Sequence, residues 1–430
     1  MAQDLTSNDK PIGLGIAGLG MAGAVMVRAV ACHPGFRLAA AAEPKGAPRS
    51  AFARDFEANI HSDIRGLCKD PTIDAVYIAT PHQFHVEHAS LAAAAGKHII
   101  LEKPMALTLA DCDAIMAAVE KAGVRLVVGH THAFDPAVRA MRAMIASGEL
   151  GRLGMIASWN YTNYLYRPRR PEELDTARGG GILFNQLPHQ IDIVRLLGGG
   201  LVKSVRAQAG GLDPARPTEG HAVAFLAFQD GAFQDGALQD GALQDGAAAS
   251  LVYGGYDFFD SDELHDWISE RGSAKQPAHG AARRALAART RDETELRTAN
   301  YAYGAADNGE PPHQPHFGVT IATCARGELR GSANGVWLYG QDGRREIALP
   351  QGPCFSGRGN VLDDLAAAIR TGQKPVHDGR WGKATLEVTL AVRASGRARG
   401  AGDYAETSGC SVKRAGSADS LRTANLTGIC

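Results

Sequence analysis

Residues 12–30 read IGLGIAGLGMAGAVMVRAV, and this stretch decides the fold. The apolar run 12–17 is followed at once by Gly18, Gly20 and Gly23, and then by apolar residues at helical spacing. Glycine permits a tight turn and a close approach of two backbones that a Cβ atom would prevent. The stretch therefore predicts a buried strand, a sharp turn and a helix, which is the first half of a βαβ unit.

The same alternation continues outward to about residue 130. Apolar strand candidates lie at 37–43, 74–80, 97–102 and 124–130, and helix candidates at 85–96 and 109–123. Both helix candidates end at a glycine, which is a common helix stop. The fold class predicted is α/β, with an N-terminal Rossmann domain, a doubly wound parallel sheet, over residues 1–133.

Beyond residue 134 the pattern changes to strands separated by turn signals. A helix candidate (135–151) leads to a strand (154–166), and two helix candidates (361–372 and 383–398) close the region. Further strand candidates lie at 202–210, 221–231, 247–256, 316–327 and 335–349. This pattern predicts a second α/β domain, residues 134–399, with an open, mainly antiparallel sheet. Residues 400–430 are rich in Ser, Gly and Thr and are predicted to form a mobile tail.

Two stretches interrupt this second pattern. Gln-Asp-Gly-Ala occurs four times between residues 229 and 247, and Asp-Gly is a strong hairpin signal, so we expect a lengthened turn between two strands. An acidic calcium repeat is the alternative, but the period does not match the known calcium repeats. Residues 270–312 form a second excursion, for which we expect a short helix with flexible flanks.

The composition excludes several classes of protein. Of the 430 residues, 45% are hydrophobic and 21% charged, and 45 Lys and Arg face 46 Asp and Glu, so neither nucleic acid nor an anionic membrane is an expected partner. No apolar run is long enough to span a membrane, and the N-terminus lacks the apolar core of a secretory signal. The seven cysteines are scattered, which argues against a disulfide framework and a zinc site. We expect a cytoplasmic protein without a metal.

The glycine turn is a candidate dinucleotide site. In GxGxxG, the first glycine makes the turn, the second lets the backbone approach a pyrophosphate, and the third lets helix and strand pack closely. Glu43 stands at the end of the next strand, where a carboxylate binds ribose hydroxyls and repels a 2′-phosphate. NAD is therefore the expected cofactor, and NADP is the alternative because Lys45 and Arg49 follow. The expected contacts here are Gly18, Gly20, Met21, Ala22, Gly23 and Glu43.

Two further strand ends should lie beside the nicotinamide. Ligands of open α/β sheets bind at the carboxyl ends of the strands. Thr80, Pro81, His85, Glu102 and Lys103 are the expected cofactor contacts there, with His82 and His85 as pocket walls. If residues 179–197 are helical, Asn185, His189 and Asp192 share one face. Histidine suits proton abstraction near neutral pH.

These motifs together resemble the Gfo/Idh/MocA family of oxidoreductases. The resemblance rests on AGLGMAG, ATPHQFH, the triplet EKP and the stretch GGGILFNQLPHQID, and it covers roughly residues 10–200. It implies a Rossmann domain, an open sheet used for homo-oligomer contacts, and Lys103 with His189 as the catalytic pair. The family has Asp where this chain has Asn185, which puts any proton relay through that position in doubt.

The expected reaction is transfer of a hydride from a substrate carbinol to NAD. His189 would act as general base on the hydroxyl, and cationic Lys103 would stabilise the developing alkoxide. Asp192 would hold the imidazole in the needed tautomer, and Asn185 would bind a substrate hydroxyl or orient His189. His130 and His132 follow the last Rossmann strand and could line the cleft.

The stretch 159–176, WNYTNYLYRPRRPEELDT, bears on the substrate. Arginines bind carboxylates and aromatics pack on rings, so an anionic, cyclic substrate is expected. The predicted substrate contacts are Tyr161, Asn163, Arg167, Arg169, Arg170, Asn185 and His189. The alternative is that these arginines are solvated or form salt bridges with Glu172, Glu173 and Asp175. The stretch is similar to the branch that oxidises a cis-dihydrodiol of phthalate to 4,5-dihydroxyphthalate.

Three other functions remain open. A sugar or polyol dehydrogenase would keep every catalytic residue and change only the pocket. A non-catalytic dinucleotide-binding sensor would be expected to lose Lys103 or His189, and both are present. A relative that uses NAD transiently for elimination or hydrolysis would accumulate no NADH.

Overall fold

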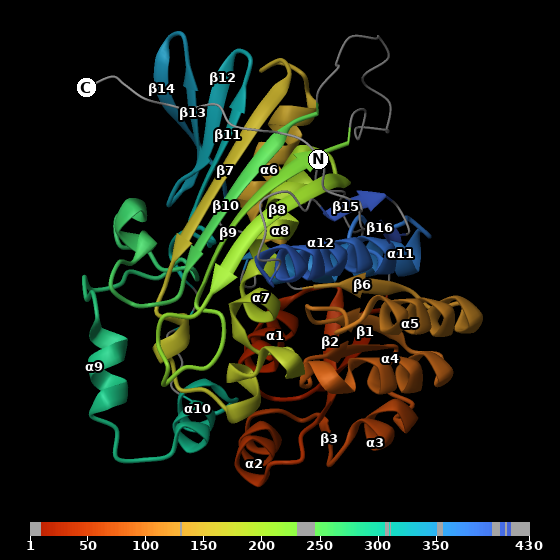
Figure 1. Cartoon of the computed structure of the whole chain (residues 1–430). Coiled ribbons are helices and arrows are strands. Elements are labelled where there is room, and N and C mark those ends of the chain that lie inside the picture. Colours follow the sequence, from red (N-terminus) through yellow and green to blue (C-terminus); the bar gives the residue numbers. More distant parts are fainter. Residues whose placement is uncertain are drawn as a thin grey trace, which may run out of the picture.

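Two sheets organise the molecule (Figure 1). The computed structural model describes residues 10–129, 131–229, 246–305, 309, 311–350, 356–397, 405–408 and 411–413. The first sheet contains β1 (Ile12–Ala17), β2 (Phe36–Ala42), β3 (Asn59–His61), β4 (Ala75–Ile78), β5 (His98–Leu101) and β6 (Leu126–Val128). These strands are parallel, in the order β3-β2-β1-β4-β5-β6. This is the doubly wound Rossmann order that the sequence predicts.

Helices cover both faces of this sheet, and all six residues of β1 are therefore buried. The helices that follow its strands are α1 (Met21–Cys32), α2 (Gly46–Asp55), α3 (Ile64–Lys69), α4 (His85–Ala94) and α5 (Leu109–Ala122). Local chemistry sets their ends: the Thr108 side chain accepts from the Asp111 N–H at the start of α5, and Gly123, with φ 66°, ends it.

The chain returns to this domain near its C-terminus. Helix α11 (Ser356–Arg370) places Val361 and Leu365 in one hydrophobic cluster with Leu14 and Ile16 of β1. The expectation that both closing helices belong to the second domain was wrong for α11. The apolar face of α11 packs against the Rossmann sheet. The periodicity of a sequence shows that a helix has such a face, but it does not show which sheet the face covers.

The second sheet is mixed and mainly antiparallel, as expected. Its order is β14-β13-β12-β11-β7-β10-β9-β8-β15-β16, and within the described residues only β7 and β10 pair in parallel. The strands are β7 (Leu153–Tyr161), β8 (Val202–Gly210), β9 (His221–Phe228), β10 (Ala248–Gly254), β11 (Val319–Cys324), β12 (Gly327–Gly331), β13 (Gly335–Gly340), β14 (Gly343–Ala348), β15 (Ala405–Ser408) and β16 (Ser411–Lys413).

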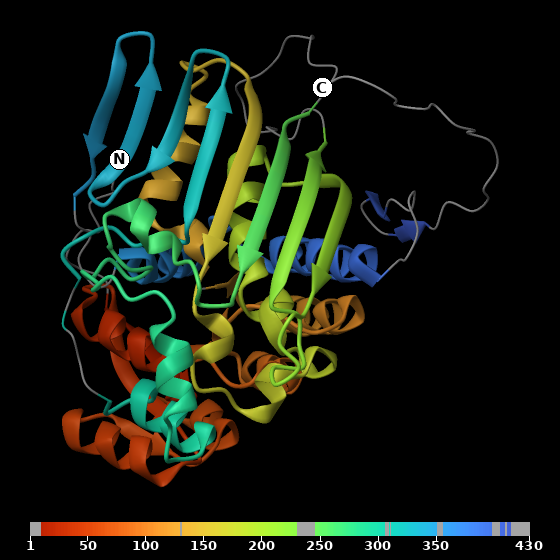
Figure 2. The same ribbon diagram turned by 60° about the vertical axis from the view of Figure 1, so that its left-hand side comes forward.

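Helices lie on one face of this sheet, and the other face is open (Figure 2). The covering helices are α6 (Pro136–Ala146), α8 (Leu187–Gly198) and α12 (Gly379–Arg397). Along β7, Ser158 and Asn160 are fully buried, whereas Trp159 and Tyr161 are 42% and 37% exposed. This alternation follows from the two-residue period of a strand.

Residues 179–197 are not one helix, so the condition under which Asn185, His189 and Asp192 would share a face is not met. They form α7 (Gly181–Asn185) and α8, with Gln186 between them. Proline is accommodated only in the first turn of a helix because it lacks an N–H, so Pro188 makes a new helix begin beside it. Asn185 and His189 therefore stand on two helices rather than on one face.

The described part of the segment between β10 and β11 carries two α-helices, where one short helix was expected. It contains η6 (Ser261–His265), α9 (Ala281–Ala287) and α10 (Glu293–Tyr301), which extend from the second sheet along the side of the Rossmann domain (Figures 1 and 2). Lys45 Nζ donates to Thr298 Oγ1 at 3.3 Å, and the Tyr303 N–H donates to the Leu19 carbonyl at 2.9 Å. These contacts fasten α10 over the glycine turn.

Short 3-10 helices complete the connections: η1 (His82–Phe84), η2 (His132–Phe134), η3 (Tyr164–Tyr166), η4 (Pro171–Leu174) and η5 (Thr176–Arg178). The Gln-Asp-Gly-Ala repeat lies mostly outside the described residues, but its flanks β9 and β10 are antiparallel neighbours, as a hairpin requires. In the predicted tail, β15 pairs with β8, and its remaining residues apart from β16 lie outside the described part.

Candidate active site

A cleft of about 550 Å³ lies between the Rossmann strand ends and the excursion. Gly18, Gly20, Glu43 and Thr80 line it from the Rossmann side. Thr298 and Tyr301 of α10 line it from the other side, together with Lys103 and Asn185. The cleft therefore joins the carboxyl ends of the strands to the second domain, which is where open α/β sheets bind ligands.

The glycine turn provides a cradle for a diphosphate. Gly18 has φ 96°, a left-handed conformation that favours glycine. A Cβ on Gly23 would lie 1.9 Å from the Gly18 carbonyl oxygen, so only glycine fits between strand and helix. A Cβ on Gly20 would meet no atom within 4 Å, so the space above it is open to a ligand. Met21 and Ala22, the first residues of α1, also line the cleft, and their helix terminus favours an anion.

Glu43 is held at the end of β2. Its Oε2 accepts from the Leu19 N–H at 2.8 Å, and its Oε1 accepts from the Lys45 N–H at 3.0 Å. Each carboxylate oxygen carries a second lone pair, so ribose hydroxyls can still donate to it. Arg49 donates to the Glu43 backbone carbonyl at 3.4 Å, and Lys45 is bonded to Thr298. The glycine cradle and this carboxylate fit NAD.

Lys103 stands directly beyond β5 and reaches the second domain. Its Nζ donates to the Asn185 backbone carbonyl at 2.9 Å. Burial lowers the pKa of Lys103, and the neighbouring Glu102 carboxylate opposes that shift while Arg358 adds to it. Glu102 accepts hydrogen bonds from the Tyr77 hydroxyl and, at 3.2 Å, from the Lys103 N–H. The ammonium group is thus fixed at the junction of the two domains.

The neighbouring strand end supports this lysine. Thr80, Pro81 and His82 line the cleft, as expected for cofactor contacts. His85 differs from the expectation, because it is fully buried and its ring nitrogens lie 3.0 Å from the carbonyl oxygens of Pro104 and Thr80. The ring ties the two loops together behind the cleft wall. Burial lowers the pKa of His85, and the hydrogen bonds of its ring to these carbonyls oppose that shift.

His189 follows Asn185, the residue whose carbonyl accepts from Lys103, by four positions along the chain. Asn185 Nδ2 donates to the carbonyls of Gly179 and Gly181, at 3.2 and 3.0 Å, and so fastens the turn before α7. His189 lies in the first turn of α8 and is 8% exposed. Its ring centroid lies 5.0 Å from that of His132 and 4.8 Å from that of Phe317. His130 lies outside the described residues.

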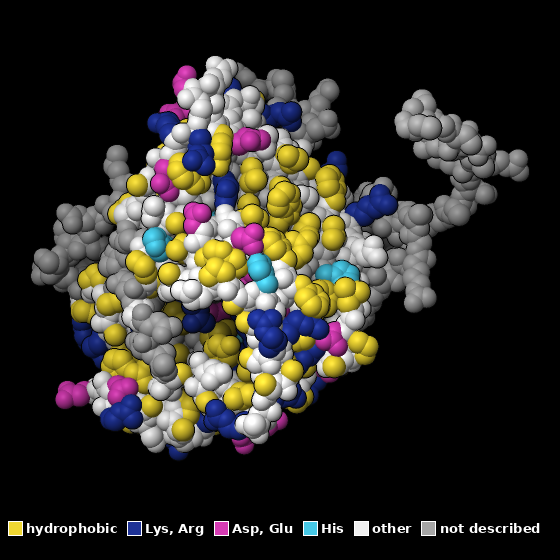
Figure 3. All heavy atoms as spheres, turned by 90° about the vertical axis from the view of Figure 1, so that its left-hand side faces the viewer, with side chains coloured by type: hydrophobic (Ala, Val, Ile, Leu, Met, Phe, Trp, Pro, Cys, Tyr) yellow, Lys and Arg dark blue, Asp and Glu magenta, His cyan; other side chains and the backbone are white. Residues whose placement is uncertain are grey.

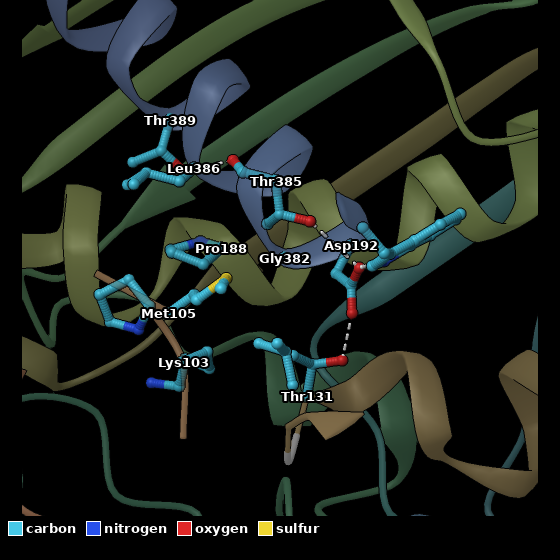
Figure 4. A pocket seen from close by; sticks show the side chains of 12 residues that line it. Lys103, Met105, Thr131, Pro188, Asp192, Gly382, Thr385, Leu386 and Thr389 are labelled. Atoms are coloured by element: carbon cyan, nitrogen blue, oxygen red, sulfur yellow. Dashed lines mark hydrogen bonds between the residues drawn. The ribbon is translucent and has the colours of Figure 1, made fainter. Parts of the chain in front are cut away.

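Asp192 has a different role from the one expected. Its carboxylate accepts from the Thr131 hydroxyl (Figure 4) and from the Trp381 indole, and it forms an ion pair with His377 at 3.1 Å. Burial would raise the pKa of Asp192, but the His377 pair lowers it to about 2. These contacts join α8 to α12 and to the loop after β6. In Figure 4 the Lys103 amine points away from Asp192.

The arginines expected to bind substrate are largely neutralised within the protein. Arg169 is 5% exposed, donates twice to the Tyr164 carbonyl, and lies 3.5 Å from Glu173. Arg170 lies 3.4 Å from Glu172 and 3.3 Å from Glu173. The salt-bridge alternative therefore holds for Arg169 and Arg170, although Arg170 also lines the cleft.

Three other predicted substrate contacts are also engaged with neighbouring side chains. Asn163 Oδ1 accepts from Arg167 Nε at 2.6 Å, and Arg167 Nη2 lies 3.6 Å from Glu270 Oε2. Tyr161 lies on the open face of the second sheet, where its ring packs 5.5 Å from Phe259. Successive side chains of a strand point to opposite faces of the sheet, so Tyr161 faces the open side because Asn160 faces the helices. Arg167 is thus paired with Glu270.

The excursion supplies residues that sequence reasoning missed. Burial would raise the pKa of Glu270, but the charges of Arg167 and His132 lower it, and the Glu270 carboxylate in turn raises the pKa of Lys103. Tyr301 lines the cleft from α10. No strand end or motif marks them, because the excursion has no periodicity that a sequence reading could place. Within the described residues no group of three or more His, Cys, Asp or Glu could hold a metal, and no helix is long and apolar enough to cross a membrane.

Two family profiles match the chain. The oxidoreductase family profile with an NAD-binding Rossmann fold matches residues 12–130, and the GFO/IDH/MocA C-terminal domain profile matches residues 138–237. A curated relative of Comamonas testosteroni, 1-carboxy-3-chloro-3,4-dihydroxycyclohexa-1,5-diene dehydrogenase, is 37% identical over 419 residues, which cover 94% of this chain and 99% of the relative.

Solved structures agree with these matches. A dehydrogenase of Bordetella bronchiseptica RB50 is 45% identical, covers 90% of this chain and 98% of its own, and superposes with a TM-score of 0.84. Levoglucosan dehydrogenase in complex with NADH and levoglucosan, 19% identical over 92% of this chain and 99% of its own, shares the fold with a TM-score of 0.66. With the glycine cradle and Lys103 in place, the chain belongs to the Gfo/Idh/MocA family and is an NAD-dependent dehydrogenase.

Proposed function

We propose that the protein oxidises a cis-dihydrodiol of a carboxylated aromatic ring to the corresponding catechol. The cis-dihydrodiol of phthalate, which would give 4,5-dihydroxyphthalate, is the substrate to test first. The observation that carries the proposal is the bond from Lys103 to the Asn185 carbonyl, four residues before His189. This bond holds the ammonium group of Lys103, from the Rossmann domain, against the segment of the second domain that carries His189.

The chemistry of these side chains suits such a carbinol. His189 accepts the hydroxyl proton, and Lys103 donates a hydrogen bond to the same oxygen as negative charge develops there. Bound NAD supplies the acceptor for the hydride that leaves the carbinol carbon. The immediate product is a hydroxydienone, whose tautomerisation restores an aromatic ring and makes the oxidation favourable. The relative from Comamonas testosteroni carries the name of a dehydrogenase of this substrate type, which supports the proposal.

A substrate panel tests the proposal. The purified protein is supplied with NAD or NADP and with the phthalate cis-dihydrodiol, the 3,4-dihydrodiol of benzoate, inositol or glucose, and NADH formation is recorded. We expect turnover of a carboxylated dihydrodiol with NAD, and a catechol as the product. Turnover of inositol or glucose alone would identify a polyol or sugar dehydrogenase instead.

We also propose that the protein forms a homo-oligomer through its second sheet. The open face of the second sheet exposes apolar side chains, of which Met155, Trp159, Val223 and Phe225 are 42–52% exposed. Figure 3 shows hydrophobic side chains gathered on this side of the molecule. A contiguous exposed apolar patch is typical of an interaction surface, and we propose that a second copy of the chain covers it. Light scattering on Phe225→Lys should show a smaller species than the unaltered protein gives.

A further inference from the structure

A second histidine, His132, packs against the imidazole of His189. It begins η2 shortly after β6, at the carboxyl edge of the Rossmann sheet, where open α/β sheets bind ligands. Its ring centroid lies 5.0 Å from that of His189, with the two planes at 71°, and 4.8 Å from that of Phe317. Phe317 lies 4.8 Å from His189 in turn, so the three rings form one cluster. An imidazole of the Rossmann domain thus contacts an imidazole of the second domain.

A buried carboxylate fixes the orientation of the His132 ring. Asp135 Oδ2 lies 2.6 Å from His132 Nδ1, and the Asp135 N–H donates to the His132 carbonyl at 3.2 Å. The carboxylate favours a proton on Nδ1, so the ring gains or loses a further proton at Nε2. The Asp135 side chain is 1% exposed and the His132 side chain 14% exposed. The pair therefore couples a buried negative charge to a ring that water reaches.

The place of Asp135 at the start of a helix does not account for its carboxylate. Asp135 is the N-cap residue of α6, a position where aspartate is common because its side chain accepts from N–H groups of the first turn. With the described backbone this carboxylate makes no capping hydrogen bond, and Pro136 occupies the first turn. The carboxylate is turned toward His132 instead. Its charge therefore acts on the imidazole.

The two side chains expected to support His189 are poor acceptors for its proton. Asn185 is an amide, and its Nδ2 donates to the backbone before α7. Asp192 is ion-paired with His377 at 3.1 Å, and this pair lowers the pKa of Asp192 to about 2 against the effect of burial. Asp135, by contrast, lies behind a ring that contacts His189.

Oxidation of a carbinol by NAD releases one proton with every hydride, and the base must lose this proton before the next turnover. We infer that His132, held by Asp135, takes the proton from His189 and passes it to solvent. The proton moves from the His189 ring to His132 Nε2, directly or through one water, and the Asp135 carboxylate balances the charge of the imidazolium. His132 is thus a positioning residue that acts through His189. The inference rests on the proposed function, in which His189 is the base.

Stopped-flow recording of NADH formation tests the inference. NAD and a compound of the substrate panel that the protein oxidises are mixed with His132→Phe, which keeps a ring beside Phe317, or with Asp135→Asn, which keeps an acceptor for His132 Nδ1. The first turnover should stay within about threefold, because His189 itself still accepts the first proton, and later turnovers should be about 10- to 100-fold slower. Added imidazole should restore the later turnovers of His132→Phe about tenfold, because it supplies a diffusible base of the missing kind.

His221→Phe is the matched control. This half-buried histidine of β9 lies with its Nδ1 3.0 Å from the Tyr256 hydroxyl, and it takes no part in the ring cluster. We expect its first and later turnovers to match those of the unaltered protein, and imidazole to leave both rates unchanged.

Two outcomes of this experiment would overturn the inference. Unchanged later turnovers in both variants would mean that the proton leaves His189 by another route. First and later turnovers slowed equally, without rescue by imidazole, would mean that the pair of His132 and Asp135 only shapes the site.

Failure of the proposed function gives a different result. If inositol or glucose is the compound oxidised, the proposed substrate is wrong, and the same test applies because that reaction also releases a proton. If no compound is oxidised, the histidine NMR signals of the NADH complex at fixed pH decide. Asp135→Asn should then reduce the protonated share of His132 and His189, and an unchanged share would contradict the inference.

Discussion

The two walls of the cleft recognise ligands by different means. The Rossmann wall presents main chain at Gly18 and Gly20, where the absence of a side chain makes the site. The opposite wall presents side chains, among them Arg170 and, from α10, Thr298 and Tyr301. The first wall suits a cofactor shared by many enzymes, whereas the second can change its specificity by exchanging single side chains.

A second contrast divides the arginines themselves. Arg169 and Arg170 carry a positive charge that neighbouring glutamates neutralise, and they hold the loop together. Arg358, by contrast, lies 3.8 Å from Glu102 Oε1, and its buried Nη1 makes no hydrogen bond with the described residues. The number of arginines in a loop is thus a poor guide to an anion site, because what matters is whether the protein already neutralises them.

The largest effect is expected where the two walls meet. Lys103→Met removes the donor to the alkoxide, and His189→Ala removes the base, so each should lower kcat about 10²- to 10⁴-fold. NADH affinity, measured by fluorescence titration, should stay within about threefold because the diphosphate cradle is untouched. A His189→Ala protein with full kcat, or one that has lost NADH binding, would contradict the assignment.

The pH profile tests the state of that lysine. Burial lowers the pKa of Lys103 from its ordinary value of 10.5. Since the cation is the active form, kcat should fall as pH rises through this lowered pKa, by about tenfold per pH unit beyond it. The alkaline limb should therefore lie below pH 10.5. A limb at or above that value would mean that the lysine is not desolvated or does not act as the cation.

A smaller effect is expected at the adenosine side of the Rossmann wall. Glu43→Ala should weaken NAD binding about tenfold and reduce the discrimination against NADP, because the ribose loses an acceptor and a phosphate is no longer repelled. Glu43→Gln is the matched variant: it keeps an acceptor and removes the charge, so it should change the NAD to NADP ratio more than the NAD affinity. Unaltered affinity for both cofactors in Glu43→Ala would refute the ribose contact.

The sequence predicted one wall well and the other poorly, for a physical reason. Gly18, Gly23 and Lys103 stand just beyond the ends of strands. Their positions could be predicted because the order of strand, turn and helix follows from neighbouring residues in the sequence. Glu270 and Arg358 come to the site through tertiary packing of the excursion and of α11, which no local pattern contains. The helix break at Gln186 could have been read from Pro188, whereas the partners of Asp192 could not.

The paired arginines should affect stability rather than binding. Arg169→Gln leaves the Tyr164 carbonyl without two charged donors, whereas Glu173 keeps Arg170 and Arg297 as counter-ions, so the free energy of unfolding should fall by about 1.5–3 kcal/mol. Denaturant unfolding measures this loss, and the KM for an acidic substrate should change little in the folded fraction. A variant of full stability with a strongly raised KM would return Arg169 to the substrate site.

The smallest of these effects concerns Asn185, where the family has Asp. Asn185→Asp replaces a donor to the Gly179 and Gly181 carbonyls by a carboxylate, so the free energy of unfolding should fall by about 1–3 kcal/mol. The new charge would stand on the residue whose carbonyl accepts from Lys103 and should raise the lysine's pKa. The alkaline limb of kcat should then move to higher pH. If stability falls but the limb stays in place, Asn185 serves the glycine turn and does not tune the lysine.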